Sequence, residues 1–496
     1  MKVLFVSSEV YPLIKTGGLA DVSGALPLAL AKLGVDIRIL VPAYPAVLAQ
    51  MPNLTSIGSV DNLPHGLSAE LRIGTLPTPA HASDANNGKV EVIVIDCPAL
   101  YTRKGGPYAD SNGVEWQDNA LRFGVLSYIA ALLSGENTPL NDQWQPDIVH
   151  CNDWQTGLVP AYLKLTQANP IKSVISLHNM AFQGCFHADW ITQLFLPRAH
   201  FQIEGFEYYN QLSFLKAGIY YADAITTVSP TYAQEIQTPA FGFGLEGLLH
   251  TRGSEITGIL NGIDTAEWNP AHDPHLVKHY DATKLAGKKS VKQALQKLLG
   301  LQIDANAPLL GIVSRLTNQK GLDLLLPNLT ALLASGCQIA LLGSGESKLE
   351  SAFLAIAAQY PSQVSVTIGY DESLSHQIMA GCDMFIMPSR FEPCGLNQLY
   401  GLAYGTLPIV NNTGGLADSV TDASATNIKS KTADGFVMAE CSIDGLLAAI
   451  ERAVNLYKTD AKVWRQLQKT AMQKPLSWDK SALAYLAVYT SLITNE

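Results

Sequence analysis

A carboxylate and a pair of glycines follow two apolar runs in the last third of the chain, and together they could handle an anionic ligand. Residues 383–387 predict a buried strand, and Glu392 follows it closely. Residues 407–410 predict the next strand, which leads into Thr-Gly-Gly at 413–415 and a helix from about 416. Ligands bind at the carboxyl edge of parallel sheets, and backbone N–H groups at a helix start favour anions. We therefore expect a binding site at this edge.

The hexapeptide Thr-Gly-Gly-Leu-Ala-Asp at 413–418 also occurs near the N-terminus, at 16–21. The first copy follows another expected strand, at 3–7, and Lys15 immediately precedes it. Alone, each Gly-Gly pair would predict an ordinary tight turn. Because both copies follow strands, we interpret them as two helix starts that favour phosphate, one in each half of the chain.

Two basic residues, Arg315 and Lys320, lie on a loop that leaves the expected strand 309–313. A guanidinium fork and an ammonium point charge both suit a diphosphate. The glycines at 343–345 follow the next strand, at 338–342, so they should lie at the same sheet edge. We expect a phosphate cradle here and a matching basic, glycine-rich edge at Lys15. A sugar nucleotide could then lie across a cleft between two domains.

Polar residues also follow three expected strands of the first half, at 147–150, 173–177 and 224–228, with helical stretches between them. This alternation predicts a doubly wound parallel sheet. The candidate contact residues at these strand ends are His150, Asp153, His178 and Asn179. Two His and one Asp could bind a metal, but no close ligand pair of the His-Glu-x-x-His kind occurs. We therefore predict no metal and no cofactor.

The strand–helix alternation restarts after the turn at 261–264, where we place a domain boundary. The expected organisation is an N-terminal Rossmann-like domain at 1–261 and a C-terminal Rossmann-like domain at 262–473. Residues 474–496 should form a helix that returns to the first domain, because a terminal helix with Trp478 needs a surface to cover. The segment Pro77–Lys89 is expected to be a polar loop between strands.

Composition excludes several classes of protein. The 496 residues are too many for one core, and 47% apolar with 15% charged residues suits buried parallel sheets. A net charge of −10 argues against a nucleic-acid partner. No apolar stretch approaches the roughly 20 residues of a membrane span, and no long apolar core marks an export signal. Seven cysteines without CxxC spacing suggest reduced thiols in the cytoplasm. A dehydrogenase or P-loop NTPase is disfavoured because both glycine fingerprints are missing.

Several motifs, in order along nearly the whole chain, resemble those of the bacterial glycogen synthase and plant starch synthase family. They are Lys15–Asp21, His178-Asn179, Asn261–Asp264, Ser314-Arg315 with Lys320-Gly321, and Arg390–Leu396. The resemblance implies a two-domain GT-B glycosyltransferase. Such an enzyme transfers glucose from ADP-glucose to the non-reducing end of an α-1,4-glucan such as glycogen, with retention of the anomeric configuration.

The resemblance also implies roles for individual residues. Arg315 and Lys320 would hold the diphosphate, Glu392 would orient the donor glucose, and His178 would contact the sugar. Lys15 would bind ADP-glucose, Tyr370 would stack near the adenine, and Tyr101 would lie on a loop that covers the donor. Further residues expected to line the substrate site are Gly17, Gly18, Asp21, Asp153, Asn179, Asn261, Cys394, Gly395, Thr413, Gly414 and Gly415.

Three positions depart from the pattern that the resemblance leads us to expect. Tyr400 stands where a broader group of retaining transferases has a second Glu, which fits the glycogen synthase branch. Asn411-Asn412 replaces an expected basic residue, and Asn397 replaces a threonine. Two alternatives stay open: a related transferase with another donor or a small acceptor, and a non-catalytic protein that binds glucan or nucleotide.

Overall fold

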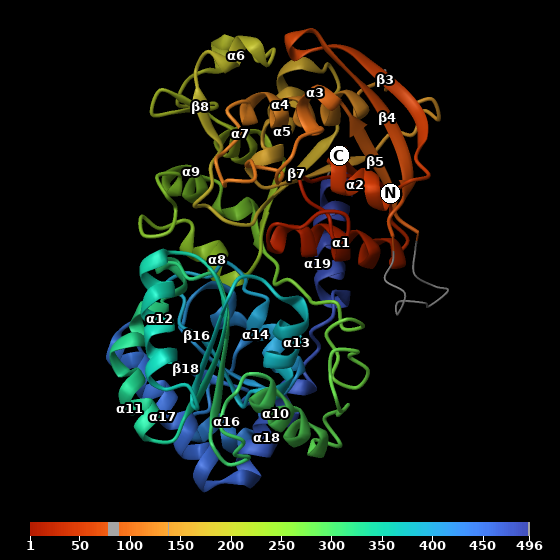
Figure 1. Cartoon of the computed structure of the whole chain (residues 1–496). Coiled ribbons are helices and arrows are strands. Elements are labelled where there is room, and N and C mark those ends of the chain that lie inside the picture. The colour runs from red at the N-terminus through yellow and green to blue at the C-terminus, as the bar shows by residue number, and fades with distance from the viewer. Residues whose placement is uncertain (78–88, 137, 495–496) are drawn as a thin grey trace. The chain divides into compact units, whose positions relative to one another are not determined.

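The computed structural model describes residues 1–77, 89–136 and 138–494 (Figure 1). The chain divides into two compact units, one of residues 1–261 with 478–496 and one of residues 262–477. Most of the polar loop expected over Pro77–Lys89 falls outside the described residues. In the described part, no helix is long and apolar enough to cross a membrane.

The first unit is built on a nine-stranded sheet. Seven strands run parallel and two antiparallel strands close one edge. Residues 3–6 of the central strand are fully buried, as expected where helices cover both faces of a parallel sheet. In sheet order the strands are β12 (Ile256–Gly258), β11 (Ala224–Thr227), β7 (Lys172–Leu177), β6 (Ile148–Asn152), β1 (Lys2–Val6), β2 (Asp36–Pro42), β5 (Glu91–Asp96), β4 (Leu67–Thr75) and β3 (Thr55–Leu63).

The last helix of the chain belongs to this first unit. Helix α19 (Asp479–Thr494) packs beside α1 (Gly18–Lys32) (Figure 1). The Tyr489 hydroxyl lies 2.6 Å from His150 Nδ1, and Ser481 Oγ donates to the Leu260 carbonyl at 2.5 Å. The helices of this unit include α3 (Pro98–Tyr101), α4 (Asn119–Leu133) and α5 (Leu158–Thr166). A small separate sheet contains β8 (Cys185–His187), β9 (Glu207–Tyr208) and β10 (Gln211–Ser213).

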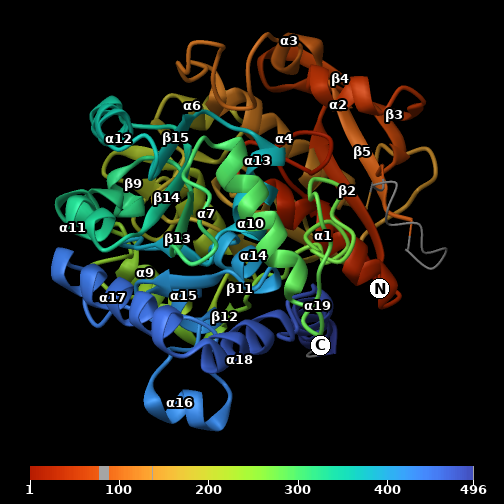
Figure 2. The same ribbon diagram turned by 60° about the horizontal axis from the view of Figure 1, so that its bottom comes forward.

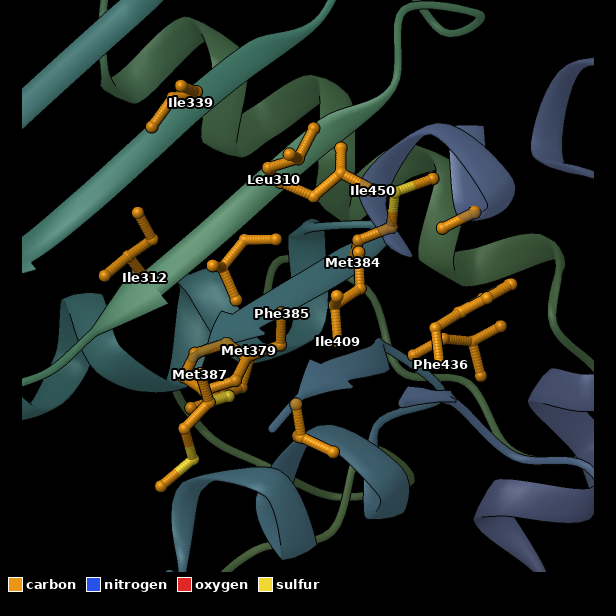
Figure 3. Packing of buried hydrophobic residues seen from close by; sticks show 14 of the residues in the cluster. Leu310, Ile312, Ile339, Met379, Met384, Phe385, Met387, Ile409, Phe436 and Ile450 are labelled. Atoms are coloured by element: carbon orange, nitrogen blue, oxygen red, sulfur yellow. The ribbon is translucent and has the colours of Figure 1, made fainter. Parts of the chain in front are cut away.

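The second unit has a six-stranded parallel sheet. Neighbouring residues of a strand point to opposite faces, so Leu310 packs in one apolar cluster and Leu309 in another. The larger cluster also contains Ile312, Ile339 and Ile450 (Figure 3). In sheet order the strands are β15 (Val364–Ile368), β14 (Gln338–Gly343), β13 (Leu309–Val313), β16 (Met384–Met387), β17 (Leu407–Val410) and β18 (Phe436–Val437).

Helices cover both faces of this second sheet. On one face α10 (Ala286–Leu298) and α13 (Glu372–Gly381) pack against each other (Figure 2). Their residues Leu295 and Ile378 join the smaller cluster with Leu309. On the other face the larger cluster takes in residues of α12 (Ser347–Gln359), α17 (Ile443–Thr459) and α18 (Ala461–Met472). The predicted doubly wound α/β class is therefore confirmed for each unit.

Several predicted elements match closely, whereas others were missed. Strands β13 and β17 have the predicted bounds. The sequence did not indicate β3, because this antiparallel edge strand is largely exposed and carries no apolar run. It also did not indicate β18, which has only two residues.

Candidate active site

Three loops of the second unit leave the carboxyl ends of three adjacent parallel strands. Strand β13 is followed by residues 314–321, β16 by 388–396 and β17 by 411–415. Because the strands are parallel neighbours, these loops share one sheet edge. The structure thus brings Arg315 and Lys320 to the same edge as Glu392, as predicted.

Glu392 is buried and paired. Its side chain accepts hydrogen bonds at Oε2 from Lys320 Nζ at 2.6 Å and from Ser389 Oγ at 2.9 Å. Only 6% of the residue is exposed, so the paired ammonium offsets the cost of burying the carboxylate. A fixed carboxylate beside a fixed cation can stabilise charge that develops during a reaction.

The loop that carries Glu392 is held from two sides by close backbone contacts. A Cβ at Gly321, next to Lys320, would lie 2.2 Å from the Pro388 carbonyl oxygen. The Gly415 N–H donates to the Glu392 carbonyl at 3.1 Å. A Cβ at Gly415 would lie 2.1 Å from the carbonyl oxygen of Cys394. Glycine is therefore required for packing at both positions, and this packing fixes the loop.

Asn411 also supports this loop. Its Nδ2 donates to the Ser389 carbonyl at 2.9 Å, and the hydroxyl of Ser389 donates to Glu392. Asn411 and Ser389 are both buried. The position where a basic residue was expected thus holds an amide that connects the end of β17 to the Glu392 loop.

The expected phosphate cradle in this unit needs one correction. Gly415 was expected to offer a free N–H group at a helix start. In the structure the carbonyl oxygens of Glu392 and Pro393 accept this hydrogen bond, each at 3.1 Å. Arg315 is exposed, and its Nη2 lies 3.4 Å from Gln319 Oε1. The groups best placed for a phosphate are therefore the side chains of Arg315 and Lys320.

In the first unit, polar residues at the ends of β6 and β7 form a second candidate region. Asp153 is 7% exposed, and its Oδ1 accepts the His178 N–H at 3.3 Å. Burial raises the pKa of Asp153 to about 7, although the Asn179 and His178 N–H groups oppose the rise. Burial lowers the pKa of His178 to about 4, so this imidazole is neutral near pH 7. Its Nε2 lies 3.1 Å from Asn152 Oδ1. Neutral polar groups of this kind suit the hydroxyls of a sugar.

The first copy of the hexapeptide also differs from expectation. The helix start at Gly17 and Gly18 was expected to favour a phosphate. In the structure the backbone N–H groups of Thr16 and Gly17 donate to Oε2 of Glu9, the Gly17 N–H at 3.2 Å. Lys15 Nζ lies 2.9 Å from Asp21 Oδ1. An internal carboxylate therefore occupies the place that the sequence assigned to an external anion.

Comparison with protein families covers most of the chain. Residues 2–251 match the model of the starch synthase catalytic domain, and residues 300–470 match that of glycosyl transferases group 1. The glycogen synthase of Nitrosomonas eutropha is 51% identical over 99% of this chain and 96% of its own. The glycogen synthase of Dechloromonas aromatica is 48% identical over 100% of this chain and 99% of its own. The chain belongs to the glycogen and starch synthase family.

A solved structure of this family agrees with that assignment. The catalytic domain of starch synthase IV from Arabidopsis thaliana, bound to ADP and acarbose, aligns with a TM-score of 0.86 and 33% identity over 99% of each chain. Sucrose-phosphate synthase from Thermosynechococcus elongatus, at 15% identity and a TM-score of 0.58, shares the fold. The chain is thus a glycosyltransferase with the GT-B architecture of the glycogen and starch synthase family, and the resemblance seen in its motifs is confirmed.

Two candidates from the sequence are core residues in the structure. Tyr101 was expected on a loop over the donor, but it ends α3, is 1% exposed and donates its hydroxyl to the Arg122 carbonyl. His150 is fully buried between Tyr489 and Ser176, and burial lowers its pKa to about 3. Neither side chain can reach a ligand in this structure. His150 was taken as a contact residue because it ends an expected strand, whereas Tyr101 was placed on a loop by the family resemblance.

The remaining candidates of the family motifs differ in accessibility. Tyr370 follows β15 and is 77% exposed, so its ring is open to a ligand. Asn261 is 7% exposed, and among the described residues its Oδ1 is buried without a hydrogen-bond partner. Cys394 is buried in the Glu392 loop. Gly18 begins α1, where its role is to start the helix.

Three residues that hold these regions together were not among the candidates: Glu9, Tyr108 and Ser389. Asn411 was noted in the sequence, but not as a support of the Glu392 loop. For two of the three, the sequence offered one signal, which was their place just after an expected strand. Glu9 follows β1, and Ser389 follows β16, each just beyond a carboxyl end. Tyr108 lies in the middle of a long loop, and the sequence held no signal for its partner.

Groups that could share a metal ion occur away from the loops around Glu392. Among the residues that the structure describes, one group is Asp273, His275 and His376, and another is Glu267, Glu372 and His376. His376 Nδ1 lies 2.8 Å from Asp273 Oδ2. Burial lowers the pKa of His376, but the neighbouring carboxylates outweigh it and raise the pKa to about 9. Near neutral pH this imidazole is therefore protonated and forms an ion pair.

Proposed function

We propose that the chain transfers glucose from ADP-glucose to the non-reducing end of an α-1,4-glucan such as glycogen, with retention of configuration. The observation that carries the proposal is the buried pair of Glu392 and Lys320, with Arg315 at the same sheet edge. The chain belongs to a family of glycosyltransferases, so the reaction class is transfer of a sugar. The pair of Glu392 and Lys320 supplies the charges that such a transfer needs. The ADP and acarbose bound by the Arabidopsis relative support a nucleotide donor and a glucan-like acceptor.

The proposed chemistry assigns charge stabilisation to the second unit. Breaking the bond between glucose and diphosphate leaves negative charge on the leaving group and positive charge on the anomeric carbon. Arg315 and Lys320 bind the diphosphate and stabilise the first charge. Glu392 orients the glucose and balances the second. Fixed charges of this kind act strongly where water is excluded.

The proposed role of the first unit is to recognise sugar and to add a basic contact. His178 is neutral, so it contacts a hydroxyl without adding charge, and its main-chain carbonyl is proposed to lie near the anomeric carbon. Asp153 and Asn179 flank it. Lys15 adds an ammonium for the nucleotide sugar. Further proposed contacts are Gly18, Asp21, Asn261, Tyr370, Cys394, Gly395, Thr413 and Gly414.

We also propose that the protein works in the cytoplasm. All seven cysteines are free, including the buried Cys151, Cys382 and Cys394. Free thiols persist in a reducing compartment.

Transfer of labelled glucose tests the proposal. The protein is incubated with ADP-[14C]glucose and glycogen, and the radioactivity of the precipitated polymer is counted. Parallel reactions replace the donor with UDP-glucose, or the acceptor with fructose or fructose 6-phosphate. Labelled polymer from ADP-glucose supports the proposal. Preference for UDP-glucose would change the donor, a labelled disaccharide would change the acceptor, and nucleotide binding without any transfer would identify a non-catalytic binding protein.

A further inference from the structure

The carboxylate of Glu9 receives hydrogen bonds from two separate loops of the first unit. Glu9 lies just after β1 and is 3% exposed. Its Oε2 accepts the backbone N–H groups of Thr16 and Gly17, the latter at 3.2 Å. Its Oε1 accepts the hydroxyl of Tyr108, which lies ninety-nine positions further along the chain. One buried carboxylate thus joins the Lys15–Asp21 segment to the loop over 102–118.

The position of this carboxylate is itself fixed. Ser7 Oγ donates to the Glu9 carbonyl at 2.8 Å and lies 2.8 Å from Ser23 Oγ of α1. The Ile14 N–H donates to the Val10 carbonyl at 2.9 Å, which closes a short hairpin after Glu9. The chain therefore leaves β1, turns back on itself and returns to Glu9 at Thr16 before α1 begins.

The Tyr108 side of the connection is also anchored. Asn119 Nδ2 donates to the Tyr108 carbonyl at 3.0 Å, and Ser8 Oγ lies 2.9 Å from the Tyr108 hydroxyl. Arg122 Nη1 donates to the Pro107 carbonyl at 2.6 Å. Since Asn119 and Arg122 belong to α4, Tyr108 presents its hydroxyl to Glu9 from a rigid support.

Lys15 is the residue whose placement depends most on this arrangement. It directly precedes the two N–H groups that Glu9 binds, and one third of its side chain is exposed. Glu9 accepts the N–H groups of Thr16 and Gly17, while the Lys15 ammonium pairs with Asp21 Oδ1 at 2.9 Å and keeps part of its surface exposed toward a ligand. The direction of that ammonium then depends on how firmly the two peptides are held.

We propose that Glu9 is a positioning residue for the nucleotide sugar: with Tyr108 behind it, its carboxylate holds the segment from Lys15 to Gly17 so that the Lys15 ammonium meets the donor. This inference rests on the proposed function, in which Lys15 binds ADP-glucose. Glu9 acts through Lys15 and does not itself touch the donor.

The test compares Glu9→Ala, Glu9→Gln and Tyr108→Phe in the full-length protein. Glutamine keeps a side-chain oxygen for the two N–H groups, and its amide can donate to the Tyr108 oxygen. The matched control is Tyr162→Phe, which removes another buried hydroxyl of this unit that donates to a backbone carbonyl, at Leu194. The measurements are kcat and KM for ADP-glucose, ADP affinity by calorimetry, and hydrogen–deuterium exchange of peptides covering residues 11–20.

Glu9→Ala is expected to raise the KM for ADP-glucose about tenfold, with kcat changed by about threefold or less, since it displaces Lys15, a binding residue, and no transition-state contact. Exchange over residues 11–20 should become faster. Glu9→Gln should restore most of the affinity for ADP-glucose. Tyr108→Phe should have a KM between those of the wild type and Glu9→Ala. Tyr162→Phe should match the wild type in both KM and exchange rate.

Wild-type KM and wild-type exchange in Glu9→Ala would overturn the proposal. A loss in Glu9→Ala that appears in kcat alone, or that Tyr162→Phe reproduces, would assign Glu9 a purely structural role and would also overturn it. Failure of the proposed function would look different, because the wild-type protein itself would then transfer no glucose from ADP-glucose. The ADP affinities and exchange rates of the variants would still decide the role of Glu9.

Discussion

The two copies of Thr-Gly-Gly-Leu-Ala-Asp, at 16–21 and 413–418, adopt different structures. In the first copy Gly17 precedes α1, a helix of fifteen residues, with an extended φ of −155°. In the second copy the corresponding Gly414 begins α15 (Gly414–Ser419), which has six residues, and its φ is +44°. A Cβ at Gly17 would meet no atom within 4 Å, whereas one at Gly414 would lie 2.1 Å from the Glu392 carbonyl oxygen. Identical residues thus stand in an open turn in one unit and in a packed turn in the other.

Buried carboxylates of the two units also differ in their partners. Glu392 is paired with the Lys320 ammonium. Asp153 is faced by N–H groups and by the negative charge of Glu9, and burial raises its pKa to about 7. The first unit therefore holds a buried acid with no paired cation among the described residues, while the second holds a buried ion pair. We expect the second unit to stabilise charge in the reaction and the first to recognise substrate.

Glu392→Gln should cause the largest loss. It removes the charge but keeps the shape, so the variant should fold and bind ADP while turnover falls about a hundredfold or more. Turnover with ADP-glucose and calorimetry with ADP measure the two effects. The matched change in the first unit is Asp153→Asn, which should cost much less turnover. Equal losses in the two variants would remove the distinction between the units.

Lys320→Ala should also lose most turnover, and added Mg²⁺ should not restore it. The reason is that Lys320 and Arg315 are proposed to neutralise the departing diphosphate, a task that other transferases give to a metal ion. Wild-type turnover should accordingly survive excess EDTA. If EDTA abolishes wild-type turnover and Mg²⁺ restores it, a metal carries the charge assigned here to these side chains.

Replacing the equivalent glycine of each hexapeptide with alanine should lower the free energy of unfolding by different amounts. Gly414→Ala places a methyl group 2.1 Å from the Glu392 carbonyl oxygen, and such overpacking costs about 2 kcal/mol. Gly17→Ala meets open space, so its effect on unfolding should stay within about 0.5 kcal/mol. Urea unfolding of both variants measures this. Similar midpoints would show that the second turn can relax around the added methyl group.

The smallest effect concerns the pH dependence of stability at Asp153. The folded state holds the pKa of this acid near 7, against 3.8 as the ordinary value, so the folded protein binds more protons between those pH values. Stability relative to Asp153→Asn should therefore fall as pH rises toward 7 and then level off. Between pH 6 and 8 the fall should be about 1.4 kcal/mol. Urea unfolding of both proteins across that range provides the comparison, and a constant difference would show that Asp153 is already ionised.

The sequence was enough to predict where several strands lie and that the main charged residues share one sheet edge. Short apolar runs predicted β13 and β17 with the observed bounds. Strand–helix alternation forces strands to run parallel, so residues just after them must share an edge. That reasoning was enough to bring Arg315, Lys320 and Glu392 together, and the structure agrees.

Burial depth and hydrogen-bond partners were decided by the tertiary structure. A polar residue near a strand end looks the same in the sequence whether a helix covers it or not, which is why His150 was misplaced. Tyr101 was expected on a loop from the family resemblance, and the structure buries it at the end of α3. His150 lies inside because α19, more than three hundred residues later, packs against it through Tyr489.

The sequence by itself determined that two glycine turns follow strands and that acids and bases gather at their edges, because periodicity and composition are local properties. It did not determine what those turns bind. The N–H groups of Thr16 and Gly17 meet Glu9, which Tyr108 holds from a distant loop, and that of Gly415 meets a backbone carbonyl. Such partners depend on how separate segments pack, and only the tertiary structure brings those segments together.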